Sequence, residues 1–286
     1  MDESGGRGAT TAFVTVGDVV AALEARYPPV LASDWDAVGL TCGDPAAPVS
    51  RILFAVDPVQ AVVDEALSEG AQMIVTHHPL LLRGVHSVAA TDAKGRVLHE
   101  LISHGIALFS AHTNADHASP GVSDALAEAL GLTALRPLVG IPGAGPAVGT
   151  GRVGDLLEAV TLEQFAEHVS MVLPPTHHGV RVAGDPQRAV RTVAVCGGAG
   201  DSFLDAAAMA ADVYLTADLR HHRAQDHLAE DGCPLIDIAH WASEWPWLEQ
   251  ASQGLRSDIT RDGGTVSTRV STTPTDPWTA HLGSTR

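Results

Sequence analysis

Cysteine is scarce in this sequence, and the three residues present, Cys42, Cys196 and Cys233, show no paired spacing and no CxxC motif. This spacing excludes a disulfide-rich secreted scaffold and argues against a cysteine-based zinc finger. We therefore predict a reduced, cytoplasmic protein in which the cysteines are small buried residues. A free thiolate that binds metal is the less frequent alternative for an isolated cysteine.

Long apolar runs are lacking as well. Although 45% of the 286 residues are hydrophobic, no run is long enough to cross a bilayer, so no membrane association is expected. Residues 1–11 are rich in glycine and lack the apolar centre of a signal peptide, and we expect them to form a disordered lead-in. The remaining length suits one large or two small globular domains.

Basic residues are few, because 17 Lys and Arg stand against 34 Asp and Glu and give a formal charge of −17. Proteins that bind nucleic acids need clustered Lys and Arg to displace counterions from phosphates, and no such cluster is present here. A nucleic-acid partner is therefore not expected. Histidine, in contrast, is abundant with 15 residues, which is more than one metal site could use.

Histidine stands out at the ends of three predicted strands. Apolar runs at 71–75, 106–109 and 235–238 predict buried strands, and ligand sites of α/β sheets usually lie at strand ends. Histidine follows all three runs, and a carboxylate follows two of them. Imidazole and carboxylate together are ligands of Zn, Mn, Fe or Ni rather than of Ca or Mg. The three segments are Thr76-His77-His78-Pro79-Leu80, His112-Thr113-Asn114-Ala115-Asp116 and His240-Trp241-Ala242-Ser243-Glu244.

The alternation of strands and helices predicts an α/β fold with mostly parallel sheets covered by helices. One β/α series occupies residues 12–136 as a first lobe, and a second series begins near residue 190 and gives a second lobe over 190–286. Residues 137–189 are expected to form a junction and an irregular middle segment. The stretch 137–151, rich in glycine and proline, predicts a loop.

The adjacent pair His77-His78 allows two interpretations. Neighbouring side chains of a strand point to opposite faces, so two ligands for a single metal would be awkward in a regular strand. At the end of a strand they can splay and serve two metals that lie side by side. Alternatively, one histidine is a ligand or a core residue and the other is solvated.

The other two segments are similarly open. His240 and Glu244 lie one helical turn apart if a helix begins at His240, so the carboxylate could bridge two metals, although a surface pair is the commoner result of this spacing. Asp116 could be a ligand, a turn residue or an N-cap. His112 could be a ligand or a partner that orients one.

A glycine loop, Cys196-Gly197-Gly198-Ala199-Gly200, follows another predicted strand and precedes a helix. Backbone N–H groups at such a place could bind an anion, such as a substrate phosphate, while a tight turn is the default. Asp218 follows a further strand, and its role is open among ribose, phosphate and metal-supporting functions. His177-His178 lies in a proline turn and is expected to be solvated.

These motifs, in this order, resemble the Nif-three-like dinuclear-metal proteins, often called GTP cyclohydrolase 1 type 2 homologues. The resemblance covers nearly the whole chain. It rests on Asp34-Trp35-Asp36-Ala37-Val38-Gly39-Leu40, the three histidine segments, the glycine loop at 196–200 and Thr216-Ala217-Asp218.

The resemblance implies two divalent metal ions in the cleft between two related α/β lobes. By resemblance, His77 and Asp116 would hold one metal, and His78 and His240 the other. Glu244 would bridge both, and His112 would lie beside them. The resemblance also implies a toroidal homo-hexamer whose sites face an inner cavity.

The sequence departs from the family at three positions, where Ala37 replaces an asparagine and Ala217 and Ala239 replace glycines. Ala37 removes a polar group that could contact a substrate or a loop. Ala239 would be strained only if its backbone had a positive φ.

A bridged metal pair predicts a hydrolase that acts through a metal-bridging hydroxide. Its substrate would be a small molecule, with or without a phosphate group, cleaved at a C–N bond of a cyclic amide or nucleotide ring, or at a phosphoester. Glu244 and His112 are the candidate catalytic residues, with His112 able to move the proton. The alternative is a non-catalytic metal-binding ring scaffold or regulatory protein.

Overall fold

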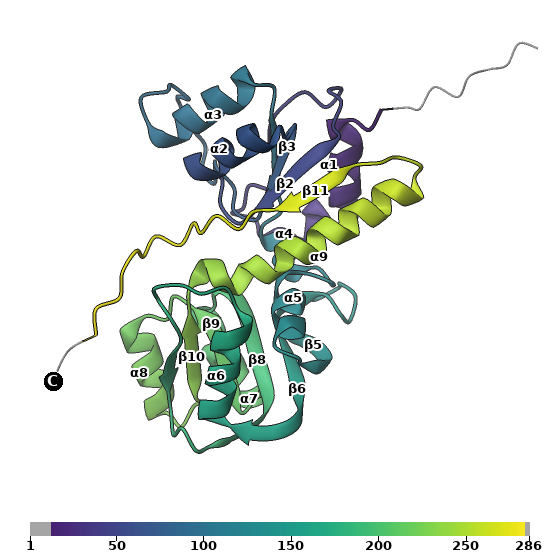
Figure 1. The fold of residues 1–286 in the computed structure, drawn as a ribbon. Coiled ribbons are helices and arrows are strands. Elements are labelled where there is room, and N and C mark those ends of the chain that lie inside the picture. The colour runs from purple at the N-terminus through teal and green to yellow at the C-terminus, as the bar shows by residue number, and fades with distance from the viewer. Residues whose placement is uncertain (1–12, 284–286) are drawn as a thin grey trace, which may run out of the picture.

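The computed structural model describes residues 13–283 and consists of two α/β lobes (Figure 1). The predicted lead-in, residues 1–11, lies outside the described residues. The predicted fold class, two α/β lobes with sheets covered by helices, is confirmed, but the expectation of mostly parallel strands holds for the first sheet only. No helix within the described part of the chain is long and apolar enough to cross a membrane.

The first lobe contains a five-stranded sheet in the order β1-β4-β3-β2-β11. All neighbours are parallel except β1, which pairs antiparallel with β4. The strands are β1 (Gly39–Cys42), β2 (Arg51–Ala55), β3 (Met73–Thr76), β4 (Ala107–Ser110) and β11 (Ser267–Val270). The helices are α1 (Val16–Arg26), the 3-10 turn η1 (Pro29–Leu31), α2 (Gln60–Glu69), α3 (Ala93–Ser103) and α4 (Thr113–His117).

Helices cover both faces of this sheet, which explains why its central strands are continuous apolar runs. Phe54, Val75 and Phe109 face a core shared with α1 and α9 (His240–Arg261). Their strand neighbours, such as Ile74 and Leu108, face a second core with α2 and α3 on the opposite side.

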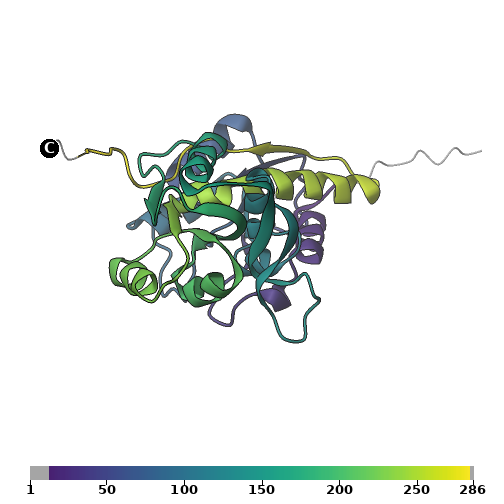
Figure 2. The ribbon, with the colours of Figure 1, turned by 90° about the horizontal axis from the view of Figure 1, so that it is seen from below.

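The second lobe contains a six-stranded sheet in the order β5-β6-β8-β9-β10-β7, in which only β8, β9 and β10 are mutually parallel. Its strands are β5 (Thr133–Gly140), β6 (Gly149–Thr161), β7 (Arg181–Ala183), β8 (Ala189–Ala199), β9 (Val213–Ala217) and β10 (Leu235–Ile238). Its helices are α5 (Val122–Ala129), α6 (Leu162–Val172), the 3-10 turn η2 (Asp201–Phe203), α7 (Leu204–Ala210) and α8 (His221–Ala229). Seen from below, this teal and green lobe lies in front, and α9 extends past it to one side (Figure 2).

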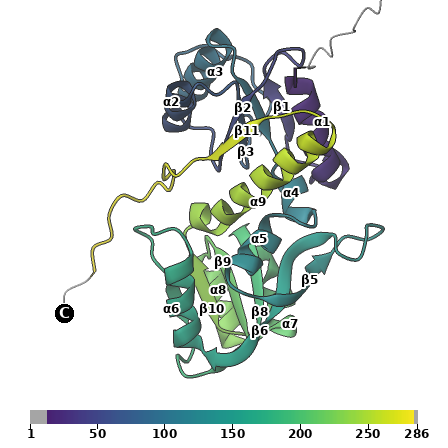
Figure 3. The same cartoon turned by 45° about the vertical axis from the view of Figure 1, so that its right-hand side comes forward.

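Helix α9 runs obliquely between the lobes and packs against both (Figure 3). It contacts α5 and β8 on one side, and α1, β2 and β11 on the other. The chain then returns to the first lobe, where β11 pairs with β2. The sequence grouped residues 266–270 with the second lobe, because periodicity along a strand does not reveal which sheet the strand joins.

The loop predicted over 137–151 is shorter in the structure, because only residues 141–148 form a loop, while 137–140 and 149–151 belong to the antiparallel pair β5 and β6. Glycines within the pair allow the two strands to approach closely. A Cβ on Gly149 would lie 2.3 Å from the Val139 carbonyl oxygen, and one on Gly154 would lie 2.6 Å from Leu135 Cδ2. Glycine within a strand often marks such a close approach.

Candidate metal centre

The strand ends of both lobes meet at one site. In the first lobe, β3 and β4 are parallel neighbours, with Thr76 opposite Ser110, so the segments that carry His77, His78 and His112 emerge side by side. Asp116 lies one turn further, on α4. In the second lobe, β10 leads into α9, whose first turn carries His240 and Glu244. All six side chains predicted from the sequence are therefore brought together.

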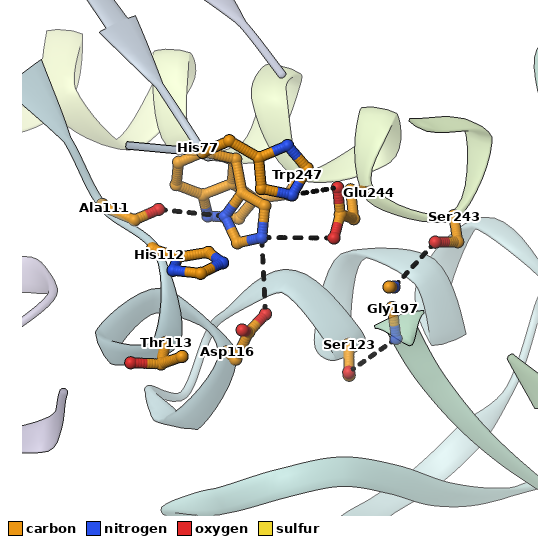
Figure 4. A network of polar contacts seen from close by, with 12 residues as sticks. His77, Ala111, His112, Thr113, Asp116, Ser123, Gly197, Ser243, Glu244 and Trp247 are labelled. Atoms are coloured by element: carbon orange, nitrogen blue, oxygen red, sulfur yellow. Dashed lines mark hydrogen bonds and ion pairs between the residues drawn. The ribbon is translucent and has the colours of Figure 1, made fainter. Parts of the chain in front are cut away.

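The Glu244 carboxylate lies in the middle of this cluster. Its Oε1 is 3.4 Å from His77 Nε2 and 2.9 Å from His240 Nε2, and its Oε2 is 3.3 Å from His78 Nε2. Glu244 is 2% exposed and His77 is 1% exposed. On the other side of His77, Asp116 Oδ1 lies 3.7 Å from the same Nε2 atom (Figure 4).

The second ring nitrogen of each of the four histidines faces an acceptor. Because carbonyl and carboxylate oxygens only accept, each Nδ1–H donates, and a neutral ring in this tautomer has its lone pair on Nε2. The pairs are His77 with the Ala111 carbonyl at 2.9 Å, His78 with Asp57 at 2.7 Å, His112 with Asp36 at 2.8 Å and His240 with Asp218 at 2.7 Å.

Sequence reasoning missed Asp57 and gave Asp36 no role. Asp57 follows β2, which is the parallel neighbour of β3. The expectation that site residues lie just after the ends of parallel strands therefore applies to Asp57 as it does to the histidines. Asp36 lies in a loop before β1 and also accepts from the Thr113 backbone N–H at 3.0 Å. Asp36 does not follow a strand, so the strand-end pattern that indicates the other site residues could not indicate this one. Asp218, whose role was open, orients His240.

In the glycine loop, Gly197 and Gly198 do not provide the anion site that the sequence left open beside a tight turn. The strand β8 continues through Ala199, and two backbone N–H groups already have acceptors: Gly197 donates to Ser123 Oγ at 3.3 Å and Gly198 to Ser243 Oγ at 2.8 Å. Neither is therefore free to bind an anion. Gly198 has a φ of +69°, and a Cβ there would lie 2.6 Å from Glu244 Oε1.

Two further expectations are resolved by the geometry. The prediction that His178 is solvated is wrong, because its Nε2 contacts Asp237 Oδ2 at 3.1 Å and its side chain is largely covered. Asp237 lies in the buried strand β10, and the local sequence around residue 178 does not indicate that this strand lies beside it. Ala239 has a φ of −63°, so the alanine at this position carries no backbone strain.

Opposite charges are closely packed in the metal-free chain. Burial opposes a proton on His78, but the Glu244 and Asp57 carboxylates raise its pKa to about 10. The charge of Glu244 raises the pKa of His240 to about 11. Burial opposes the charged form of Glu244, yet the neighbouring imidazoliums hold the pKa of this carboxyl well below its usual range. The Glu244 carboxylate is therefore ionised and can pair with a cation, either a protonated imidazole or a metal ion.

The residues fit a metal ion. Two groups of side chains each offer three ligand atoms within 4.8 Å of one another: His77, His78 and His112, and His78, His240 and Glu244. Glu244 Oε2 is buried and makes no well-aligned hydrogen bond, with only His78 Nε2 nearby at 3.3 Å, which is costly unless another group satisfies it. Imidazole and carboxylate are the donor set of Zn, Mn, Fe and Ni sites.

Related proteins share this chain's sequence over almost its full length. The model of the Duf34/NIF3 (NGG1p interacting factor 3) family matches residues 14–277. A Streptomyces coelicolor protein named "GTP cyclohydrolase 1 type 2 homolog" is 52% identical over 271 residues, which cover 94% of this chain and 95% of the relative. A Mycobacterium tuberculosis protein of the same name is 38% identical over an alignment 372 positions long, gaps included, which covers 93% of this chain and 97% of the relative.

Solved structures show the same fold. The crystal structure of a Bacillus cereus protein related to NIF3 has a TM-score of 0.86 at 26% identity and covers 94% of this chain and 99% of its own. A Staphylococcus aureus protein has a TM-score of 0.86 at 28% identity, covering 94% and 100%. The resemblance inferred from the motifs is thereby confirmed, and the chain belongs to the Duf34/NIF3 family.

Proposed function

We propose that this protein is a dinuclear-metal-dependent hydrolase whose centre is formed by the histidine segments of both lobes. The observation that carries the proposal is the buried Glu244 carboxylate, which lies within 3.4 Å of three imidazole Nε2 atoms and leaves Oε2 without a hydrogen bond. One carboxylate among several histidines suits a bridging ligand better than a structural ion pair.

The proposed ligands divide into two sets that share Glu244. His77 and Asp116 would hold one ion, and His78 and His240 the other. His112 belongs to the same three-residue group as His77 and His78, so it would serve as a further ligand of the first ion or as its neighbour. The ions would be Zn, Mn, Fe or Ni, in keeping with the donor set.

When bound, a metal pair lowers the pKa of water and stabilises negative charge that develops on an attacked oxygen. The protein residues provide orientation and proton transfer. Asp36 fixes the ring of His112 through Nδ1, so Nε2 can exchange a proton with a reacting group. Trp247 lies edge-on against His77, with ring centroids 5.4 Å apart, and helps to exclude water from the buried side of the cluster.

Two bond classes are candidates for cleavage, a C–N bond in a ring or amide and a phosphoester. The names of the relatives favour the first, because they refer to a cyclohydrolase. In the glycine loop the N–H groups of Gly197 and Gly198 already have acceptors, which weakens the case for a phosphate there and so for the second class. A cytoplasmic location and a toroidal homo-hexamer are also proposed, and light scattering that gives a monomer at micromolar concentration would contradict the hexamer.

Metal content and turnover test the proposal together. Elemental analysis of protein purified without chelator should give about two metals per chain. Glu244→Gln and His78→Ala should lose metal, because each removes a proposed ligand. Glu249→Gln, an exposed carboxylate of the same helix, is the matched control and should retain it. Unchanged metal in both site variants would refute the ligand assignment.

The same samples distinguish a hydrolase from a scaffold. A screen of cyclic amides, nucleotides and phosphoesters should reveal turnover that Glu244→Gln abolishes and Glu249→Gln preserves. Two bound metals without turnover on any of these substrates would favour the alternative of a metal-binding scaffold or regulatory protein.

A further inference from the structure

A cavity of about 240 Å³ opens directly beside the proposed metal centre. His78 and His240 form its inner wall. His178, which the sequence placed in a solvated turn, lies on another wall, and the segment Thr275–Trp278 after β11 forms the outer side. Figure 1 shows this yellow C-terminal segment leaving β11 and running past the beginning of α9 toward the second lobe.

The C-terminal segment is anchored at several points. Ser271 Oγ and Thr273 Oγ1 both donate to Glu65 Oε2, at 2.6 and 2.8 Å. Further on, Thr275 Oγ1 donates to Asp57 Oδ2. Asp57 is the carboxylate whose other oxygen accepts from His78 Nδ1. The outer wall of the cavity is therefore tied to a residue that orients a proposed metal ligand.

The lining residues offer acceptors and aromatic surface. Three of them are carboxylates, and none of them is Lys or Arg. Asp57 and Asp218 already accept hydrogen bonds from His78 and His240. Asp276 differs, because its Oδ2 is buried and has no hydrogen-bond partner. Trp278, 64% exposed, lies at the same cavity and presents an indole that no core contact accounts for.

We propose that this cavity binds the planar nitrogen heterocycle of the substrate, with Trp278 stacked on the ring and Asp276 accepting from its N–H edge. The inference rests on the proposed hydrolase, because it places the ring beside His78 and His240. Cavities for drug-sized ligands measure roughly 300–1,000 Å³, so this smaller one suits a single ring system. Aromatic stacking is tolerant of ring identity, whereas a buried carboxylate selects for N–H donors.

The same walls argue against a phosphate in this cavity. The lining has three carboxylates and no lysine or arginine, and the imidazoles of His78 and His240 are already paired with Asp57, Asp218 and Glu244, so a phosphate oxygen would lack a free cationic partner. The N–H groups of Gly197 and Gly198 also have acceptors. A phosphate, if the substrate has one, would have to lie outside the cavity. The proposal therefore favours cleavage of a C–N bond in or next to a ring over hydrolysis of a phosphoester.

Two purines that differ by one amino group test this inference on the protein as purified. 2-Aminopurine reports its own stacking by loss of fluorescence, and purine, which lacks the exocyclic amine, can be measured by competition. The wild type should bind 2-aminopurine more tightly than purine. Trp278→Ala should weaken both by about tenfold, while Trp278→Phe should restore much of the binding.

Asp276→Asn should act on selectivity, because its lost charge matters most for the ligand with the extra N–H donors. We expect about tenfold weaker binding of 2-aminopurine and a smaller preference over purine. A fold defect alone would not change this ratio. Leu282→Ala, an exposed apolar residue of the same C-terminal segment, is the control and should bind like the wild type.

Each outcome bears on one of the two proposals. The cavity assignment would be overturned if the wild type did not bind 2-aminopurine, or if Trp278→Ala and Asp276→Asn both bound it as tightly as the wild type. This holds even if metal and turnover are present. Selective binding that both variants weaken, with metal content unchanged, would support it. Such binding without turnover of any substrate would keep the cavity and refute the hydrolase.

Discussion

Gly198 lies so close to Glu244 that a Cβ on residue 198 would come within 2.6 Å of Glu244 Oε1 and 3.2 Å of His240 Nε2. The strand β8 can therefore pass the cluster only with glycine at this position. The close contact joins the backbone of β8 at Gly198 to the carboxylate that three imidazoles contact, those of His77, His78 and His240.

The first prediction concerns this contact. Gly198→Ala should displace Glu244 and lower the metal content, in addition to a backbone cost of about 1–2 kcal/mol for alanine at positive φ. Gly263→Ala is a matched control, because its φ is +85° and its Cβ would meet no atom within 4 Å. Gly263→Ala should show the backbone cost alone in chemical denaturation and Gly198→Ala at least as large a loss, whereas only Gly198→Ala should lose metal in elemental analysis. Equal metal content in the two would contradict the contact's role.

A second prediction concerns Asp57, which accepts from His78 Nδ1 at 2.7 Å. Replacing it with asparagine should weaken metal binding by about 10–100-fold, because such outer partners fix the orientation and basicity of a ligating imidazole. Competition with a chromophoric chelator would measure the change. Asp64→Asn, an exposed residue of α2, should leave the affinity unaltered.

The third prediction is a release of protons when metal binds. In the metal-free chain the pKa values of His78 and His240 are raised to about 10 and about 11, so both rings are protonated at pH 7. A metal must displace these protons, and its affinity should therefore fall as the pH is lowered. Calorimetric titration of chelator-treated protein with Zn²⁺, in buffers of different ionisation enthalpy, counts the protons. A count of zero would show that the imidazoles do not bind the ion.

The fourth prediction concerns stability away from the site. Arg152, 1% exposed, donates to both oxygens of Asp124 at 2.6 and 2.7 Å and to the carbonyls of Ala118, Gly149 and Gly151. Arg152→Ala leaves a buried carboxylate uncompensated and should cost about 3–5 kcal/mol of unfolding free energy.

The control for Arg152 is an exposed ion pair. The Arg220 side chain pairs with Asp201 but is 73% exposed, so Arg220→Ala should change the unfolding free energy by less than about 1 kcal/mol. Denaturant titration of the two variants under one set of conditions measures the difference. Comparable losses would mean that the buried pair contributes no more than a surface one.

The sequence predicts the site better than the topology, and the reason is physical. Ligands at strand ends follow from local pattern, since apolar runs locate the strands and parallel neighbours bring His77, His78 and His112 to one edge. The partner of a strand is a property of the folded chain, so β11 was assigned to the wrong lobe and Asp57 was overlooked. Glycine composition is also ambiguous: within 137–151, glycine marks both the loop at 141–148 and the flanking strand residues, where it allows β5 and β6 to approach closely.

The return of β11 to the first lobe has a consequence for biosynthesis. Strand β11 pairs with β2, with Ser267 opposite Arg51. The edge of the first sheet that β11 forms can therefore be completed only after nearly the whole chain has been synthesised. The cluster is delayed in the same way, because His77 and His78 emerge early and His240 and Glu244 come from α9. A nascent chain on the ribosome would hold the early histidines without their carboxylate, and metal loading would therefore follow translation instead of accompanying it.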